Sequence, residues 1–195
     1  MKAMKTIKKI DRQGLTLTEL MISLAIFGVI MGVLFGFLAG ARNSYSETRE
    51  RAQYQQSMRA VMSLITREIR SAGCDPLDDN FNFDKFGVAD AGQLQVRMDL
   101  NGDMDFADIG PDENVSYSFA GGNLTRDNGN GPQVILRGVQ VFTFTYFDAV
   151  GAELNVVPLS AANRELVRFV GINIQGQTDR GEPVTYTTRI ALRNG

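Results

Sequence analysis

The feature that most constrains this chain is an apolar run near its N-terminus. No charged side chain occurs from Leu20 to Ala41, and such a run is long enough to cross the roughly 30 Å hydrocarbon core of a bilayer as a helix. One acidic residue, Glu19, stands at the start of the run, and a basic leader that ends in Gly14 precedes it. A carboxylate at the edge of a bilayer costs free energy, so Glu19 is a candidate functional residue.

Three interpretations of the leader and the run compete. A secretory signal would be cut after its apolar stretch, and Ala39-Gly40-Ala41 offers a suitable pattern. Residues 20–38 nevertheless exceed the roughly 7–15 apolar residues of such a signal. An uncleaved anchor explains the length but neither Glu19 nor Gly14. In the third interpretation the leader is removed ahead of the run, which explains both residues. The basic leader stays in the cytoplasm and the C-terminus crosses the membrane.

The leader, Gly14 and Leu15-Thr16-Leu17-Thr18-Glu19 resemble the processing motif of the type IV prepilins. In that family a membrane peptidase cuts after the glycine and methylates the new amine, which implies cleavage between Gly14 and Leu15. Leu15 departs from the phenylalanine that the family usually has there. Glu19 matches the family's acidic fifth mature residue, and its carboxylate would neutralise an ammonium group that the helix dipole disfavours. The alternative is that Glu19 only lies among lipid headgroups.

A stripe of glycines runs along the apolar segment. Gly28, Gly32, Gly36 and Gly40 recur at intervals of four residues and therefore share one face of a helix. Small residues at this spacing let helices approach closely in lipid or in a helix-lined filament core. We therefore predict that this stripe packs against other helices.

The helix is expected to continue beyond the membrane, from about Thr16 to Ala72. No proline interrupts residues 42–72, Gly73 is a suitable residue to follow the helix, and Pro76 prevents its continuation. Apolar residues at helical intervals predict a buried stripe formed by Tyr45, Ala52, Met58, Val61, Leu64 or Ile65, Ile69 and Ala72. The charged residues between them, Glu68 included, are expected to form a solvated face.

Beyond Pro76 the apolar pattern changes to a period of two, which is typical of strands. We expect strands near 94–98, 115–119, 123–126, 134–136, 139–147, 166–174 and 184–192, with a hairpin at Gly121-Gly122 and a helical turn at 160–164. They predict one antiparallel sheet covered by the amphipathic helix, and the fold class is α+β. Phe142, Phe144 and Tyr146 are expected to pack in the core rather than to form a base-stacking surface.

An acidic loop at 99–113 is the one candidate for a metal site. Its carboxylates and amide recur as in the first half of a calcium loop of the EF-hand type. The candidate calcium ligands are Asp99, Asn101, Asp103, Asp105 and Asp108. The loop departs from that pattern at the sixth position, Met104, and the twelfth, Gly110, so Asp108, Asp112 or Glu113 would complete the site. The alternative is a solvated turn, since the same residue types favour turns.

Composition limits the functions that remain. The chain of 195 residues suffices for one domain and a span, and it holds no His and one Cys. Cys74 cannot form an internal disulfide and is expected to be a small buried side chain; a reactive thiol is the alternative. No nucleophile with an adjacent base is present, so we expect no enzyme activity. Removing residues 1–14 changes the formal net charge from −2 to −6, which disfavours nucleic acid.

The segments SAGCDP, SYSFAGGNLTRD and VFTFTYFD also resemble minor pilins of the PilW type. The resemblance implies a leader (1–14), a transmembrane and filament-core helix (15–41), an amphipathic helix (42–73) and a periplasmic β-rich domain (74–195). It further implies a single-pass inner-membrane subunit that helps to initiate a type IV pilus or lies at its tip. Its partners would be other pilins, the prepilin peptidase and the inner-membrane assembly platform. A minor pseudopilin of a type II secretion system is the nearest alternative, followed by an adhesin or DNA-uptake pilin and a membrane-anchored enzyme.

Overall fold

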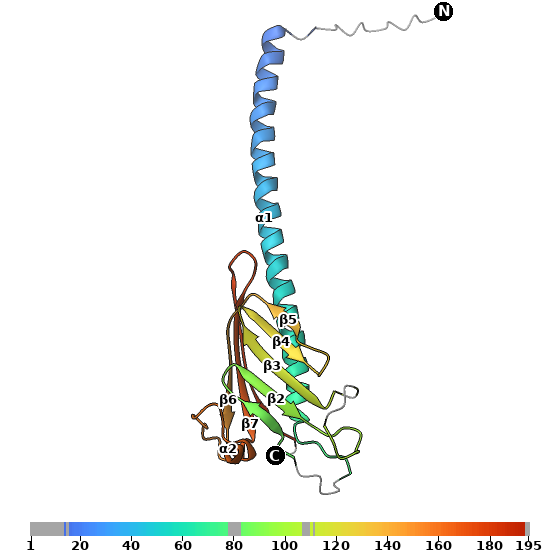
Figure 1. Ribbon diagram of the computed structural model, residues 1–195. Coiled ribbons are helices and arrows are strands. Elements are labelled where there is room, and N and C mark those ends of the chain that lie inside the picture. The colour runs from blue at the N-terminus through green and yellow to red at the C-terminus, as the bar shows by residue number, and fades with distance from the viewer. Residues whose placement is uncertain (1–13, 15, 78–82, 107–109, 111, 194–195) are drawn as a thin grey trace, which may run out of the picture. The chain divides into compact units, whose positions relative to one another are not determined.

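The computed structural model describes residues 14, 16–77, 83–106, 110 and 112–193 (Figure 1). The chain forms two compact units, residues 1–46 and 47–195. The elements are α1 (Leu17–Arg70), β1 (Phe86–Ala89), β2 (Gln93–Arg97), β3 (Asn114–Ala120), β4 (Asn123–Asp127), β5 (Gln133–Arg137), β6 (Val139–Phe147), α2 (Ala161–Leu166), β7 (Phe169–Gln177) and β8 (Pro183–Ala191). The predicted α+β arrangement of one long helix followed by antiparallel strands is confirmed.

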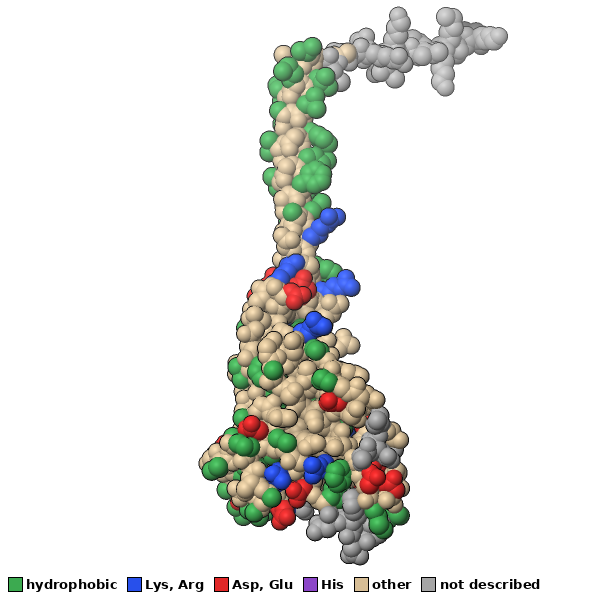
Figure 2. Space-filling view, in the orientation of Figure 1, with side chains coloured by type: hydrophobic (Ala, Val, Ile, Leu, Met, Phe, Trp, Pro, Cys, Tyr) green, Lys and Arg blue, Asp and Glu red, His purple; other side chains and the backbone are tan. Residues whose placement is uncertain are grey.

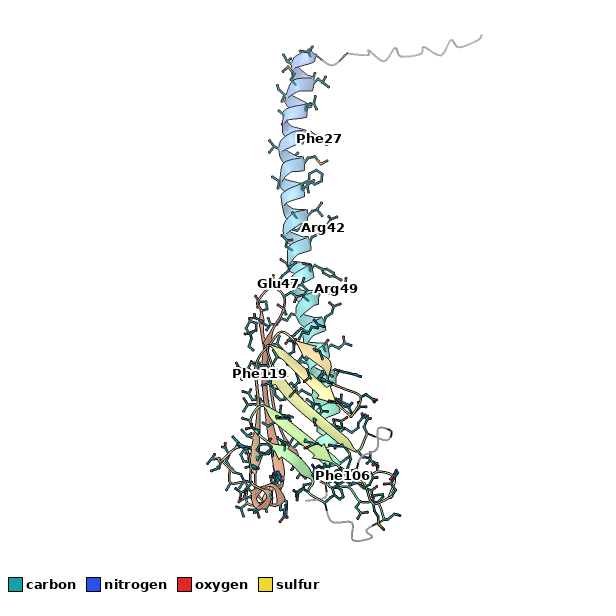
Figure 3. The ribbon with its side chains drawn as sticks, in the orientation of Figure 1. Phe27, Arg42, Glu47, Arg49, Phe106 and Phe119 are labelled. Carbon is teal, nitrogen blue, oxygen red and sulfur yellow. The ribbon has the colours of Figure 1, made fainter. Side chains whose placement is uncertain are left out.

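The first unit contains the N-terminal part of α1. The helix begins at Leu17 because the Thr16 hydroxyl accepts a hydrogen bond from the Glu19 backbone N–H at 3.3 Å, the geometry of an N-cap. None of the described residues of this unit is buried, and apolar side chains cover its surface (Figure 2). Phe27, which points away from the helix axis, is 56% exposed (Figure 3). The helix is long and apolar enough to cross a membrane.

In the second unit α1 turns an apolar stripe toward the strands. The stripe begins at Met58 and continues through Ile65 and Ile69. The prediction that Tyr45 and Ala52 belong to the buried stripe is wrong, because both are exposed, and Tyr45 lies in the first unit. The helix ends as expected, because Gly73 adopts a positive φ of 69° and donates a backbone hydrogen bond to the carbonyl of Arg97 at 2.9 Å. This bond ties the end of the helix to β2.

The strands form two antiparallel sheets rather than the single sheet that the sequence predicts. One has the order β1-β2-β3-β4-β5 and the other β6-β7-β8. The chain passes from β5 to β6 through Gly138, whose φ is 71° and whose added Cβ would lie 2.9 Å from the carbonyl oxygen of Gln177. This left-handed residue, together with the close approach of β7, lets the chain leave the first sheet and begin the second within one residue.

Two further differences are local. The strand expected at 166–174 begins at Phe169, because α2 extends to Leu166 after Ser160 caps it. β1 was not expected, since its four residues are too few to show an alternating pattern.

One hydrophobic core joins α1 to both sheets. Phe142, Phe144 and Tyr146 are 4%, 1% and 0% exposed, so the prediction that this aromatic row packs in the core is confirmed. Phe142 and Phe144 meet edge to face, with ring centroids 4.8 Å apart. The Tyr146 hydroxyl donates to the carbonyl of Asp90 at 2.7 Å, which satisfies its polar end. Cys74 is a half-buried free thiol packed against this core.

Candidate functional site

The predicted processing segment lies at the start of α1. Gly14 is exposed, and Leu15 lies outside the described residues. Glu19 occupies the first turn, where the positive end of the helix dipole favours a carboxylate. Its backbone carbonyl accepts a hydrogen bond from the Ser23 hydroxyl at 2.8 Å, and its side chain is exposed. Cleavage after Gly14 and an assembly role for Glu19 stay predictions.

The predicted packing stripe is open along its whole length. A Cβ added to Gly28, Gly32, Gly36 or Gly40 would meet nothing within 4 Å. The described part of this chain therefore gives no internal reason for four small residues on one helix face. Contact with a helix of another molecule would supply such a reason, and that packing stays a prediction.

The acidic loop gathers three carboxylates. Asp99 and Glu113 are both 0% exposed, and ligand oxygens of Asp99, Asp103 and Glu113 lie within 4.8 Å of one another. The Asp99 carboxylate accepts from the backbone N–H groups of Gly102 and Met104 at 2.6 and 3.1 Å. One oxygen of Glu113 accepts from two more backbone N–H groups in the loop, at 2.7 and 3.1 Å. The two buried carboxylates thus fold the loop around themselves.

The other predicted ligands are placed differently. Asn101 donates to Asp103 at 3.0 Å, and the Asp105 side chain is not part of the three-carboxylate group. Asp108 lies outside the described residues. Met104, at the position where a calcium loop has glycine, has a φ of 67°, so the backbone takes the conformation that glycine would favour. Nearby, the guanidinium carbon of Arg97 lies 4.8 Å from the centroid of the Phe106 ring. Figure 3 shows Phe106 in this region.

These bonds are of the kind that side-chain turns of Asp and Asn make with the backbone of their own loop. The same oxygens are hard ligands of the type that calcium prefers. Calcium binding therefore stays a prediction, with Asp99, Asp103 and Glu113 as the residues that the structure brings together.

A buried ionic network joins α1 to the first sheet, and the sequence interpretation did not anticipate it. Glu68, expected on a solvated face, is only 7% exposed. It accepts hydrogen bonds from the Tyr117 hydroxyl and from Arg126, whose nearer Nη2–Oε1 distance is 2.7 Å. Arg126 also pairs with Asp112 at 2.6 Å, and Asn128 donates to Asp112 at 2.7 Å. The burial of Glu68 could have been predicted from its spacing, because Glu68 follows Ile65 by three residues and so lies on the same helix face.

The network changes the acid–base properties of its members. Burial and the adjacent Glu68 carboxylate both raise the pKa of Tyr117, which remains protonated. Burial lowers the pKa of Arg126, but hydrogen bonds to Glu68 and Asp112 outweigh this and raise it overall. Burial also opposes ionisation of Asp112, yet its bonds to Arg126 and Asn128 lower its pKa. The pKa values of Tyr117 and Arg126 are raised and that of Asp112 is lowered, so each of these three groups moves away from proton transfer near neutral pH.

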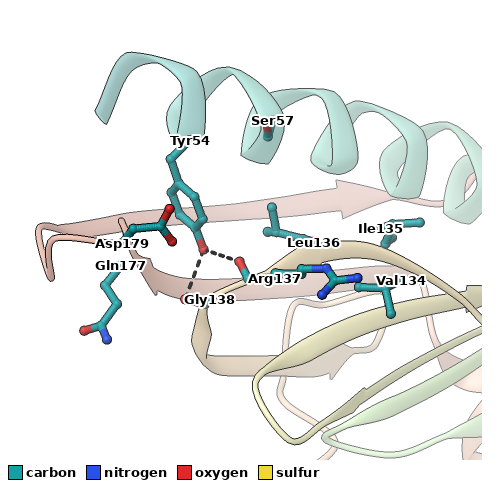
Figure 4. A pocket seen from close by; sticks show the side chains of 9 residues that line it. All are labelled: Tyr54, Ser57, Val134, Ile135, Leu136, Arg137, Gly138, Gln177 and Asp179. Atoms are coloured by element: carbon teal, nitrogen blue, oxygen red, sulfur yellow. Dashed lines mark hydrogen bonds between the residues drawn. The ribbon is translucent and has the colours of Figure 1, made fainter. Parts of the chain in front are cut away.

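A small groove of about 360 Å³ lies beside Tyr54 (Figure 4). The Tyr54 hydroxyl lies 3.1 Å from the carbonyl oxygens of Arg137 and Gly138 and donates to them. A Cβ at Gly176 would collide with this hydroxyl, so the tyrosine fills the space above the two glycines. Burial raises the pKa of Tyr54, which keeps it a donor. Tyr54 thus braces α1 against the β5–β6 junction.

Comparison with known proteins bears on the N-terminal segment. Residues 10–35 match the family model for the prokaryotic N-terminal methylation motif, a type IV prepilin-like signal. The motif indicates a type IV pilin- or pseudopilin-like protein. It implies processing by a prepilin peptidase and association with pilin components in general, and with α1 it is consistent with a single-pass inner-membrane protein. A search of curated proteins found no match to the chain.

Proposed function

We propose that this pilin-like chain is a minor pilin of the PilW type, which helps to initiate a type IV pilus or lies at its tip. The observation that carries the proposal is the methylation motif at residues 10–35, which overlaps the start of a helix that runs uninterrupted from Leu17 to Arg70. The second half of that helix belongs to a β-rich domain with its own core. The role is structural and requires no catalysis by this chain.

The mechanism uses one helix in two environments. In the inner membrane the apolar residues of α1 face lipid. After cleavage at Gly14 the same segment would enter a bundle of equivalent helices, where the glycine stripe permits close approach. The carboxylate of Glu19 would neutralise the new N-terminal ammonium of its own or a neighbouring subunit, which fixes the register of the incoming helix.

A minor pseudopilin of a type II secretion system is the second candidate, because the motif and the long helix support it equally. Deletion of the gene separates the two functions. A minor pilin predicts fewer surface pili with normal protein secretion, and a pseudopilin predicts the reverse. An adhesin or DNA-uptake pilin is less well supported, because the mature chain has a net charge of −6 and an acidic protein repels a long polyanion.

The mature N-terminus tests the proposal directly. Intact-mass analysis of protein extracted from membranes should show a chain that begins at Leu15, with or without one N-terminal methyl group. A chain that begins at Met1 or at Arg42 would exclude prepilin processing. Detection of the Leu15 form in sheared pili would then place the processed subunit in the filament.

A further inference from the structure

A second groove, of about 920 Å³, lies between the last turns of α1 and the strand β8. Four arginines line it, namely Arg59, Arg67 and Arg70 from the helix and Arg193 from the residues that follow β8. The helical arginines share one face, because Arg59 and Arg67 are about two turns apart. The side chains of Tyr186 and Thr188 form the wall on the β8 side.

The groove concentrates positive charge in an acidic unit. Residues 47–195 hold 20 acidic and 14 basic side chains, yet none of the four groove arginines has an ion pair among the described residues. Arg126, Arg164 and Arg180, by contrast, pair with Glu68, Asp84 and Glu50, respectively. Four unpaired guanidinium groups around one groove favour an anionic occupant, and Arg is suited to bind carboxylates through paired hydrogen bonds.

The adjoining strand offers unpaired backbone groups. Within the described part of the sheet β8 pairs only with β7, over nine residue pairs without a bulge. The backbone N–H of Leu192 donates to the carbonyl of Arg168, and that of Thr178 donates to the carbonyl of Glu182, both at 3.0 Å. These two bonds show which residues of β8 point their backbone groups toward β7 and which point them away, because the two kinds alternate along an antiparallel ladder. It follows that Thr185, Thr187 and Arg189 direct their N–H and C=O groups away from β7, toward the free edge.

We propose that an extended, acidic segment of another subunit adds to β8 as a further strand and places its carboxylates on the groove arginines. The unpaired edge selects a polypeptide, because neither a lipid headgroup nor a nucleic acid can continue a backbone ladder. The arginines select acidic side chains, while the acidic surroundings repel a long polyanion. The proposal rests on the proposed function only in taking the partner to be another filament subunit.

The test uses the full chain in detergent and defined probes. A fluorescein-labelled octapeptide of alternating Asp and Val residues is titrated by fluorescence anisotropy, next to a twin with Lys in place of Asp and a single-stranded oligonucleotide. The acidic peptide should bind best, and the double variant Arg67→Gln/Arg70→Gln should weaken it at least about tenfold, equal to about 1.4 kcal/mol. The control Arg180→Gln, which changes an arginine that pairs with Glu50 and does not line the groove, should leave the affinity unchanged.

Hydrogen exchange tests the strand addition independently of the affinity measurement. Bound peptide should slow exchange at the amides of Thr185, Thr187 and Arg189, whereas the intervening amides, already bonded to β7, should stay slow with or without peptide. Thr187→Pro removes one outward N–H and an exposed side-chain hydrogen bond to Asn173, but no backbone hydrogen bond to β7. It should abolish binding while largely preserving the melting temperature.

Equal binding of the Lys twin, preference for the oligonucleotide, or binding without protection of the outward amides would each overturn the proposal. Because the assay needs no filament, its failure with a processed chain found in pili would leave the proposed function standing. If the chain binds the peptide but never enters pili, the proposed function is overturned, whereas the proposal that the groove binds an acidic strand stands.

Discussion

At the scale of single residues, Glu19 combines two roles that the sequence alone does not separate. Its backbone N–H completes the N-cap made by Thr16, and its carboxylate lies in the first turn, where the helix dipole favours it. Glu19 contributes only its backbone N–H to the cap bond, so a change of its side chain leaves that bond in place. The carboxylate can therefore be removed without loss of the helix start.

Glu19→Ala should leave the amount of protein in the inner membrane unchanged and lower its incorporation into pili several-fold. The reason is that the N-terminal ammonium would enter the filament without its counter-charge. Immunoblots of membrane and sheared-pilus fractions measure both quantities. Glu47→Ala, which removes an exposed glutamate farther along the same helix (Figure 3), is the matched control. Equal incorporation of the two variants would remove the assembly role from Glu19.

At the scale of elements, the junction of α1 with the first sheet depends on a buried charge. Glu68 lies on the helix and Arg126 and Tyr117 lie on β4 and β3, so the network joins three elements. Loss of one partner would leave buried polar groups unsatisfied, which costs more than the intact pair contributes.

Glu68→Ala should lower the free energy of unfolding by about 3 kcal/mol, as expected for a broken buried ion pair. Glu68→Gln should cost less, because its amide oxygen still accepts from Tyr117. Urea denaturation followed by circular dichroism gives both values. Glu47→Ala should change stability by no more than about 0.5 kcal/mol. A similar small effect of Glu68→Ala would show that the network does not stabilise the fold.

The loop between β2 and β3 allows a test of the calcium hypothesis. Millimolar calcium should raise the melting temperature of the detergent-solubilised chain, since a ligand that binds only the folded state stabilises it. Asp103→Ala should abolish this increase, because Asp103 is the exposed carboxylate of the group. Asp148→Ala, in the turn after β6, is the control and should retain the increase. No shift with calcium would establish the loop as a turn held by its own carboxylates.

Local patterns predicted most elements but not their long-range arrangement. Gly73 and Pro76 indicated the end of α1, and alternating residues such as Val115 and Tyr117 indicated β3. The division into two sheets was not predictable, because it depends on which distant strands pair and on the approach of Gln177 to Gly138. The groove arginines illustrate the same limit, since Arg193 joins Arg67 only through the tertiary fold.

At the scale of the whole molecule, stability should respond to acid through Asp112. Its pKa is lowered in the folded state, so it stabilises the fold above its unfolded pKa of about 4, and this contribution is lost as pH falls through the lower folded value. The difference in unfolding free energy between wild type and Asp112→Asn should be constant from about pH 7 to pH 5 and shrink below about pH 4. Denaturant melts at each pH measure it. A difference that does not change with pH would contradict a lowered pKa.

The position of Glu68 also limits how α1 can move against the sheets. A shift of the helix by one turn, about 5.4 Å, would replace the glutamate opposite Arg126 with a neighbour such as Leu64 or Ala72, so that the guanidinium would lose its buried counter-charge and keep only Asp112. Axial slippage in small steps is therefore unfavourable, and tension applied along the helix is passed to β3 and β4. Under load the domain should yield by losing its fold rather than by sliding along its own backbone.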